Sequence, residues 1–313
     1  MNTIRRRTPW GRRPPWGRII PFYVMALPGL VYLLVNNYIP LYGILIAFKK
    51  LNYQKGIFGS DWNGFKNFEF LFASSDAWTI TRNTVLYNIA FLIVGTVLAI
   101  ILAILINEMK NRLVSRICQS LTLLPYLMSW VVVSYLVFAF LSSESGLINK
   151  SILGPLGIPN INWYQEKKYW PFILIFVNSW KGVGYSMIIY LAAIVGISQD
   201  YYEAATLDGA NKWQQIRKIT LPMLTPTMLV ILALSLGQMF RSDFGLFYQI
   251  PKNSGALFSV TRTIDVYVYH ALMKNSNYGM SSAASVYQSV VGFILILSTN
   301  FIIRKHRPES ALF

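Results

Sequence analysis

Five long stretches of the chain contain no Lys, Arg, Asp or Glu, and they restrict the folds that this sequence can adopt. They comprise residues 19–48, 83–107, 117–143, 219–240 and 275–303. A sixth region, Trp170 to Ser198, has a similar length and is interrupted only by Lys181. About 20 mostly apolar residues in a helix cross a bilayer, and these runs lack the alternation of barrel strands. We therefore predict an all-α polytopic membrane protein with six transmembrane helices.

The distribution of positive charge predicts how these helices are oriented. Segments 1–19, 108–117, 196–220 and 304–313 carry 15 Lys or Arg in 64 residues, whereas the alternate connections carry 11 in 99. Cytoplasmic segments of membrane proteins are enriched in Lys and Arg. Both termini are therefore predicted to be cytoplasmic. The chain then divides into a basic N-terminal segment (1–19), whose six arginines are the strongest anchor, one membrane domain (20–303) and a short tail (304–313).

Composition argues against several other classes of protein. Only 13% of the residues are charged, and the basic ones flank apolar runs instead of covering a polar domain, so nucleic acid is not an expected partner. One cysteine and two histidines leave little to hold a metal. The sequence contains no G-x-x-x-x-G-K-[ST], H-E-x-x-H or G-x-S-x-G motif. We expect no catalytic residue, metal or cofactor in this chain, although an intramembrane enzyme or a channel remains the rival class.

The predicted external connection 48–83 is rich in aromatic residues. Aromatic side chains are enriched where membrane proteins meet the lipid headgroups, so an interfacial belt is the favoured interpretation. A binding surface is the alternative. In either case, we expect this connection to be partly ordered.

The predicted cytoplasmic connection 196–220 contains signals for two short helices. Asp200 is suited to cap the first helix, with Glu203 completing a capping box. Gly209 suits the left-handed residue that ends such a helix, and Asn211 is suited to cap the next. Pro222 then marks the start of the fifth span. By these signals alone, an amphipathic hairpin on the inner leaflet is the favoured interpretation.

The identities in this connection favour a more specific interpretation. They are Glu203-Ala204-Ala205, Asp208-Gly209-Ala210, Ile219, Leu221-Pro222 and Pro226. This set resembles the cytoplasmic EAA loop of ABC-importer permeases, and the six-span layout is similar to the type I fold of the maltose-type carbohydrate-uptake permeases. Segments 242–249, 264–269 and 304–313 resemble the polysaccharide-permease branch. The resemblance implies ATPase-coupling roles for Glu203, Ala204, Ala205, Asp208, Gly209, Ala210, Leu221 and Pro222.

The resemblance also implies a set of partners that this chain does not contain. They are a second related permease subunit, an ATPase dimer that binds ATP and Mg, and an external solute-binding protein. The chain would lie among the lipids of the bacterial plasma membrane and import oligosaccharides, with no ATP hydrolysis of its own. A non-sugar solute is the alternative cargo.

Polar side chains within the fourth and fifth spans are the predicted substrate pathway. By resemblance and by their cost in a membrane, the candidates are Trp180, Lys181, Gly182, Tyr185, Gln238, Arg241 and Asp243. Aromatic rings can stack on sugars, while Gln238 and Asp243 can accept hydroxyl hydrogen bonds. If Lys181 and Arg241 face a low-dielectric pathway, they favour acidic, uronate-containing cargo. The favoured alternative is that Asp243 neutralises Arg241 locally and leaves a net neutral site for sugar hydroxyls. A structural ion pair between Asp243 and either Lys181 or Arg241 is a further alternative from the sequence.

Overall fold

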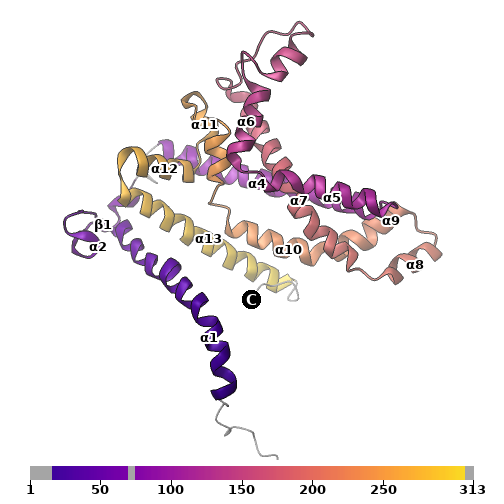
Figure 1. Ribbon diagram of the computed structural model, residues 1–313, viewed down its shortest axis with the longest axis horizontal. Helices are drawn as coiled ribbons and strands as arrows, with labels where there is room; N and C mark the ends of the chain where they lie inside the picture. Colours follow the sequence, from indigo (N-terminus) through magenta and orange to yellow (C-terminus); the bar gives the residue numbers. More distant parts are fainter. Residues whose placement is uncertain (1–15, 70–74, 307–313) are drawn as a thin grey trace, which may run out of the picture.

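The structure, a computed structural model, describes residues 16–69 and 75–306, almost all of them in helices or short turns between helices (Figure 1). The longer helices are α1 (Trp16–Leu33), α4 (Ser75–Asn107), α5 (Arg112–Leu127), α6 (Trp130–Leu141), α7 (Trp170–Val195), α8 (Gln199–Leu207), α10 (Leu221–Gly237), α12 (Ile264–Asn275) and α13 (Tyr278–His306). The shorter ones are α2 (Gly56–Gly59), α9 (Lys212–Gln215), α11 (Phe258–Thr261), the 3-10 helices η2 (Ile39–Phe48), η3 (Lys66–Phe68), η5 (Lys167–Tyr169) and η8 (Gly255–Leu257), and the π-helices η1 (Leu34–Tyr38), η4 (Ile148–Leu153), η6 (Ile216–Thr220) and η7 (Gly245–Gln249). Most of the arginines of the N-terminal segment and most of the C-terminal tail lie outside the described residues.

Within the described residues, five continuous segments are long and apolar enough to cross a membrane. They are Ile20–Phe48, Asp76–Asn107, Lys167–Val195, Lys212–Gly237 and Tyr278–Lys305. The all-α membrane fold predicted from the uncharged runs is therefore confirmed. A helix satisfies its backbone hydrogen bonds internally, as a bilayer requires.

The predicted span over residues 117–143 is not one continuous helix. This stretch contains most of α5 and all of α6, which meet at a bend of 98°. Pro125 removes a backbone donor from the last turn of α5, Met128 is extended, and Ser129 begins α6 by accepting a hydrogen bond from the amide of Val132 at 3.3 Å. The uniform apolarity of residues 117–143 predicted a membrane-spanning length but gave no sign of the break between α5 and α6.

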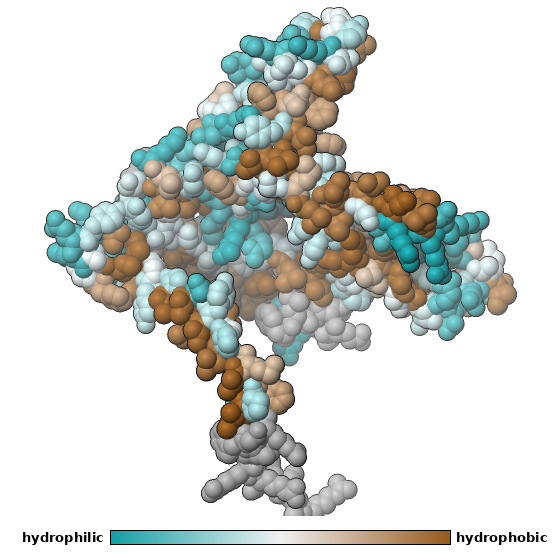
Figure 2. Space-filling model, viewed as in Figure 1, coloured by the Kyte–Doolittle hydropathy of each residue, from teal (hydrophilic) through white to brown (hydrophobic). Residues whose placement is uncertain are grey.

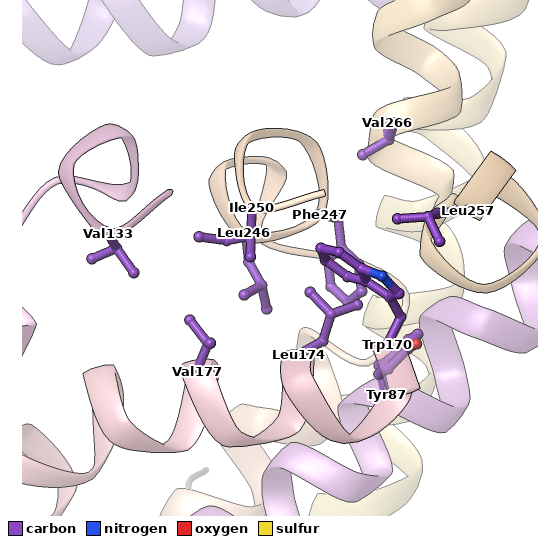
Figure 3. Packing of buried hydrophobic residues seen from close by; sticks show 10 residues of the cluster. All are labelled: Tyr87, Val133, Trp170, Leu174, Val177, Leu246, Phe247, Ile250, Leu257 and Val266. Atoms are coloured by element: carbon purple, nitrogen blue, oxygen red, sulfur yellow. The ribbon is translucent and has the colours of Figure 1, made fainter. Parts of the chain in front are cut away.

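The largest buried cluster joins α7 to η7, a segment distant in sequence. Leu174 and Val177 of α7 point toward Leu246 of η7 and Ile250, the residue after η7 (Figure 3), and all four side chains are buried. Trp170, at the start of α7, is also fully buried in this cluster. The arrangement fixes η7 against the middle of the helical body, so the chain between α10 and η7 has a defined path.

Helices α5 and α7 approach one another closely at Gly184. A Cβ atom at this position would overlap the backbone carbonyl of Thr122 on α5, so only glycine permits this separation. Close approach through small residues is a common packing mode in membranes, where apolar burial gives little net attraction between helices. The position therefore sets the distance between α7 and the helix before the break.

The body has two structurally different ends, and α1 stands apart from both (Figure 1). Helices α8 and α9 lie at one end, whereas α12 and the strands β1 (Lys49–Lys50) and β2 (Asp61–Trp62) lie at the other. The connection predicted to be partly ordered contains this two-stranded sheet. Nearly every described side chain of α1 is exposed, and its visible face is mostly apolar (Figure 2).

Candidate functional site

The first candidate site is the hairpin formed by α8 and α9, which contains the predicted coupling residues. Ser198 caps α8, because its hydroxyl accepts a hydrogen bond from the amide of Asp200 at 3.3 Å. The prediction that Asp200 is the cap with Glu203 completing a capping box was therefore wrong by two residues. Asp200 instead lies in the first turn, where its charge stabilises the helix dipole.

Gly209 ends α8 in the way that the sequence predicted. Its φ is +78°, and its amide donates to the carbonyl of Thr206 at 3.0 Å, while the amide of Ala210 donates to the carbonyl of Ala205 at 2.8 Å. These two bonds form a Schellman motif, which requires the left-handed residue. The direction of the chain after α8 thus depends on one glycine.

The second half of the hairpin is braced against the first. Asn211 caps α9, as predicted, and completes a capping box with Gln214. The side chain of Gln215 donates to the hydroxyl of Thr206 at 2.9 Å, and a hydroxyl pair at 3.0 Å joins Tyr202 to Thr220 at the entrance to α10. The hairpin is therefore connected by side chains to the start of the next span.

The outer surface of the hairpin is exposed and partly apolar. Glu203, Ala204, Asp208 and Pro222 are exposed, whereas Ala205, Ala210 and Leu221 are half-buried. Leu207 is 89% exposed and Trp213 is 68% exposed. Two large apolar side chains at such exposures form a surface suited to a protein partner.

The second candidate site lies around an irregular segment, residues 238–244, between α10 and η7. Asn88 of α4 donates to the carbonyls of Met239 and Arg241 at 2.9 and 2.8 Å. Gln288 of α13 donates to the carbonyl of Phe240 at 2.7 Å. The amide of Ser242 donates to Oδ2 of Asp265 at 2.6 Å. Non-helical backbone at membrane depth needs such partners, so these side chains stabilise the break.

Asp243 connects this segment to the break between α5 and α6. Its Oδ1 accepts hydrogen bonds from the amides of Gly245 and Leu246 at 2.8 and 3.3 Å. Its Oδ2 accepts one from the indole N–H of Trp130, the first residue of α6, at 2.7 Å. Three N–H donors therefore satisfy this carboxylate.

The two basic candidates do not pair with Asp243, contrary to the structural alternative considered from the sequence. Nζ of Lys181 donates to the carbonyl of Tyr126, in the last turn of α5, at 2.9 Å. The same atom lies 5.3 and 5.0 Å from the ring centroids of Tyr126 and Trp130. Arg241 is exposed and contacts the hydroxyl of Ser289 at 3.4 Å. In the part of the chain that the structure describes, neither cation forms a salt bridge.

The remaining pathway candidates lie in different surroundings. Tyr185 stacks on Tyr126 with a centroid distance of 4.9 Å, and the two side chains are 50% and 43% exposed. Gln238 lines a cavity of about 400 Å³ with Asn88. Trp180 lines a separate, almost wholly apolar cavity of about 720 Å³ between α6 and α7, and Gly182 faces open space.

Four residues that shape this region were not among the candidates from the sequence: Asn88, Tyr126, Trp130 and Asp265. Asn88 was detectable as a polar side chain within the uncharged run 83–107. Tyr126 and Trp130 carried no distinguishing signal, because their importance depends on the break after α5. Asp265 lies in a predicted external connection, where charged residues are common.

No group of three His, Cys, Asp or Glu side chains suited to a metal occurs among residues 16–69 and 75–306. The surface around residues 238–244 is polar and aromatic. Its exposed groups are the Tyr126–Tyr185 pair, the guanidinium of Arg241 and the carboxylate of Asp243. Such groups are suited to contact a hydrophilic solute.

Comparison with known proteins identifies the kind of protein to which these features belong. Residues 95–308 match the family of binding-protein-dependent transport system inner membrane components. The polygalacturonan/rhamnogalacturonan transport system permease protein YteP of Bacillus subtilis (strain 168) is 34% identical over 287 residues, covering 92% of this chain and 88% of YteP.

Two solved structures agree with this assignment. A bacterial ABC transporter involved in the import of the acidic polysaccharide alginate has a chain that is 30% identical, with a TM-score of 0.84, covering 93% of this chain and 97% of that one. A bacterial alginate ABC transporter in complex with an alginate pentasaccharide-bound periplasmic protein gives 30% identity and a TM-score of 0.83, covering 94% and 98%. The predicted resemblance to ABC-importer permeases is confirmed, and with it a transport role for the chain. The chain belongs to the family of binding-protein-dependent transport system inner membrane components, and it is a multi-pass permease of the bacterial inner membrane.

Proposed function

We propose that this permease imports acidic oligosaccharides that an external solute-binding protein delivers. A second related permease subunit completes the pathway, and a separate ATPase dimer, which binds ATP and Mg, drives the transport cycle. The observation that most strongly supports an acidic cargo concerns the partners of the charged groups around residues 238–244. Lys181 and Arg241 contact neutral groups instead of Asp243.

The basic side chains in this region form no salt bridge with a described carboxylate. Lys181 has one backbone carbonyl as its hydrogen-bond partner, and Arg241 has one hydroxyl. Both partners are neutral. The nearby carboxylate of Asp243 is engaged by three N–H groups. An anionic group entering this region therefore gains electrostatic and charge-assisted hydrogen-bond energy that a neutral sugar does not.

The neighbouring groups suit the rest of a saccharide. The exposed Tyr126–Tyr185 pair offers a ring face to the C–H surface of a sugar. Gln238 can both donate to and accept from hydroxyl groups. The solved relative that transports the acidic polysaccharide alginate supports the same class of cargo.

The α8–α9 hairpin is the proposed docking element for the ATPase. In this proposal the exposed Leu207 and Trp213 insert into the partner, while Glu203, Ala204, Ala205, Asp208, Gly209 and Ala210 form the adjoining surface and fix its shape. Leu221 and Pro222 begin α10 and transmit movement of the hairpin to that span. Both termini, including segments 1–19 and 304–313, face the cytoplasm in this proposal.

The experiment uses the complete transporter reconstituted in liposomes. We expect its binding protein, loaded with an oligogalacturonate, to stimulate ATP hydrolysis and uptake, and native mass spectrometry to detect two permease chains with an ATPase dimer. Stimulation by neutral oligosaccharides alone would overturn the proposed cargo. A particle that lacks an ATPase would overturn the proposed coupling.

A further inference from the structure

We infer that Trp130 determines cargo charge selectivity by preventing Asp243 from neutralising Lys181. This inference rests on the proposed import of acidic oligosaccharides. It assigns a role to a residue that contacts both Asp243 and Lys181 and that was not a candidate from the sequence.

Trp130 contacts both a cation and an anion. Its indole N–H donates to Oδ2 of Asp243 at 2.7 Å, while Nζ of Lys181 lies 5.0 Å from the centroid of its ring. The face of an indole attracts cations and its N–H attracts carboxylates. One side chain therefore satisfies both charges separately, and no salt bridge between Lys181 and Asp243 occurs among the described residues.

The position of the indole is fixed by the surrounding backbone. Trp130 is the first residue of α6, immediately after the 98° bend. Its ring lies against Gly245, where a Cβ atom would overlap the indole. Glycine at position 245 therefore provides the space that the indole ring occupies.

The carboxylate itself has a structural task that keeps it in this region. Oδ1 of Asp243 accepts the two amides at the start of η7, which explains an acidic residue at this point. Oδ2 would be free without the indole N–H. An unpaired carboxylate and a nearby ammonium group attract one another. Removal of the indole donor therefore leaves Asp243 free to pair with Lys181.

The test compares Trp130→Phe, Asp243→Asn and the double variant in the reconstituted transporter, with Trp78→Phe as a control. Trp78 is exposed at the start of α4, far in sequence from these groups. Uptake of an oligogalacturonate is compared with uptake of its neutral methyl ester. Phenylalanine retains an aromatic ring beside Gly245 and lacks the N–H donor, whereas asparagine retains a helix-capping oxygen and lacks the charge.

We expect Trp130→Phe to reduce uptake of the acidic chain about tenfold, equivalent to about 1.4 kcal/mol, and to leave uptake of the ester and the Trp78→Phe control nearly unchanged. The double variant should recover acidic uptake, because an asparagine in place of Asp243 cannot neutralise Lys181. Equal loss of both cargoes, or loss that Asp243→Asn does not rescue, would overturn the inference and indicate a packing role. A wild-type transporter that does not accept the acidic chain would overturn the proposed function itself.

Discussion

The side-chain amide of Asn88 donates hydrogen bonds to the backbone carbonyls of Met239 and Arg241, at 2.9 and 2.8 Å. Asn88 belongs to α4, whereas the two carbonyls belong to the irregular segment after α10. Lipid offers no hydrogen-bond donors to such carbonyls. A polar side chain of α4 therefore stabilises the backbone from which Arg241 and Asp243 project.

Replacing Asn88 by leucine should destabilise the permease. Two carbonyls would lose a donor, and each unsatisfied buried polar group costs about 1–3 kcal/mol. We expect a lower midpoint of thermal unfolding for the purified complex and reduced transport. The matched control is Asn36→Leu in η1, because among the described residues that amide bonds only to the carbonyl of Tyr32 one turn earlier. Equal stability of the two variants would contradict this role.

The two glycines of α7 should respond differently to alanine. At Gly184 a Cβ atom would overlap the carbonyl of Thr122. At Gly182 a Cβ atom would meet no described atom within 4 Å beyond its neighbours and the backbone of its own helix. Overpacking typically costs about 1–3 kcal/mol, so Gly184→Ala should lower the unfolding midpoint and Gly182→Ala should not. Thermal unfolding of both variants in detergent measures the difference. A stable Gly184→Ala variant would show that α5 and α7 do not meet as closely as described.

The hairpin should depend on backbone conformation at Gly209 more than on side-chain volume. Its φ of +78° is unfavourable for valine and tolerable for asparagine. We expect Gly209→Val to abolish cargo-stimulated ATP hydrolysis while the spans remain folded, and Gly209→Asn to retain most of the stimulation. Full stimulation in the valine variant would show that the rigid turn is not required for coupling.

The sequence predicted the spans because a bilayer imposes a strict composition on them. It also predicted the turn at Gly209 and the cap at Asn211, because both are local features. The cap of α8 was misassigned because Ser198 and Asp200 are both good capping residues, and only the backbone distinguishes them.

The sequence indicated which residues could line the pathway, but not which of them contact one another. Lys181 and Arg241 were evident as charges within or beside a span. Whether they pair with Asp243 depends on the positions of Trp130 and Tyr126, which in turn depend on the bend after α5. A sharp bend within a uniformly apolar run has little signature in composition, so these contacts required the three-dimensional arrangement.

Acid should destabilise the end of the molecule that contains α12. Burial, with additional effects of Lys274 and Arg262, lowers the pKa of His270 from its ordinary value of 6.5. Its Nε2 lies 2.9 Å from Oδ1 of Asn253, within a turn that contains two residues with positive φ. The unfolded chain then binds a proton more readily than the folded one, so this stability is complete above pH 6.5 and declines as the pH falls toward the lowered pKa.

The measurement is the midpoint of thermal unfolding between pH 7.5 and pH 5, for wild type and His270→Gln. We expect a decline in the wild type that is smaller in the variant, because glutamine retains a donor for Asn253 and does not titrate in this range. Identical slopes for the two proteins would show that His270 does not contribute to the acid sensitivity.

The most direct test of the account is the charge selectivity of transport when Lys181 and Arg241 are each replaced by glutamine. Uptake of an oligogalacturonate and of its methyl ester is measured with the reconstituted transporter. We predict that either substitution reduces uptake of the acidic chain about tenfold or more and leaves uptake of the ester nearly unchanged, because a neutral cargo gains little from these charges. Equal loss of both cargoes would contradict the account and assign the two cations to the stability of the fold.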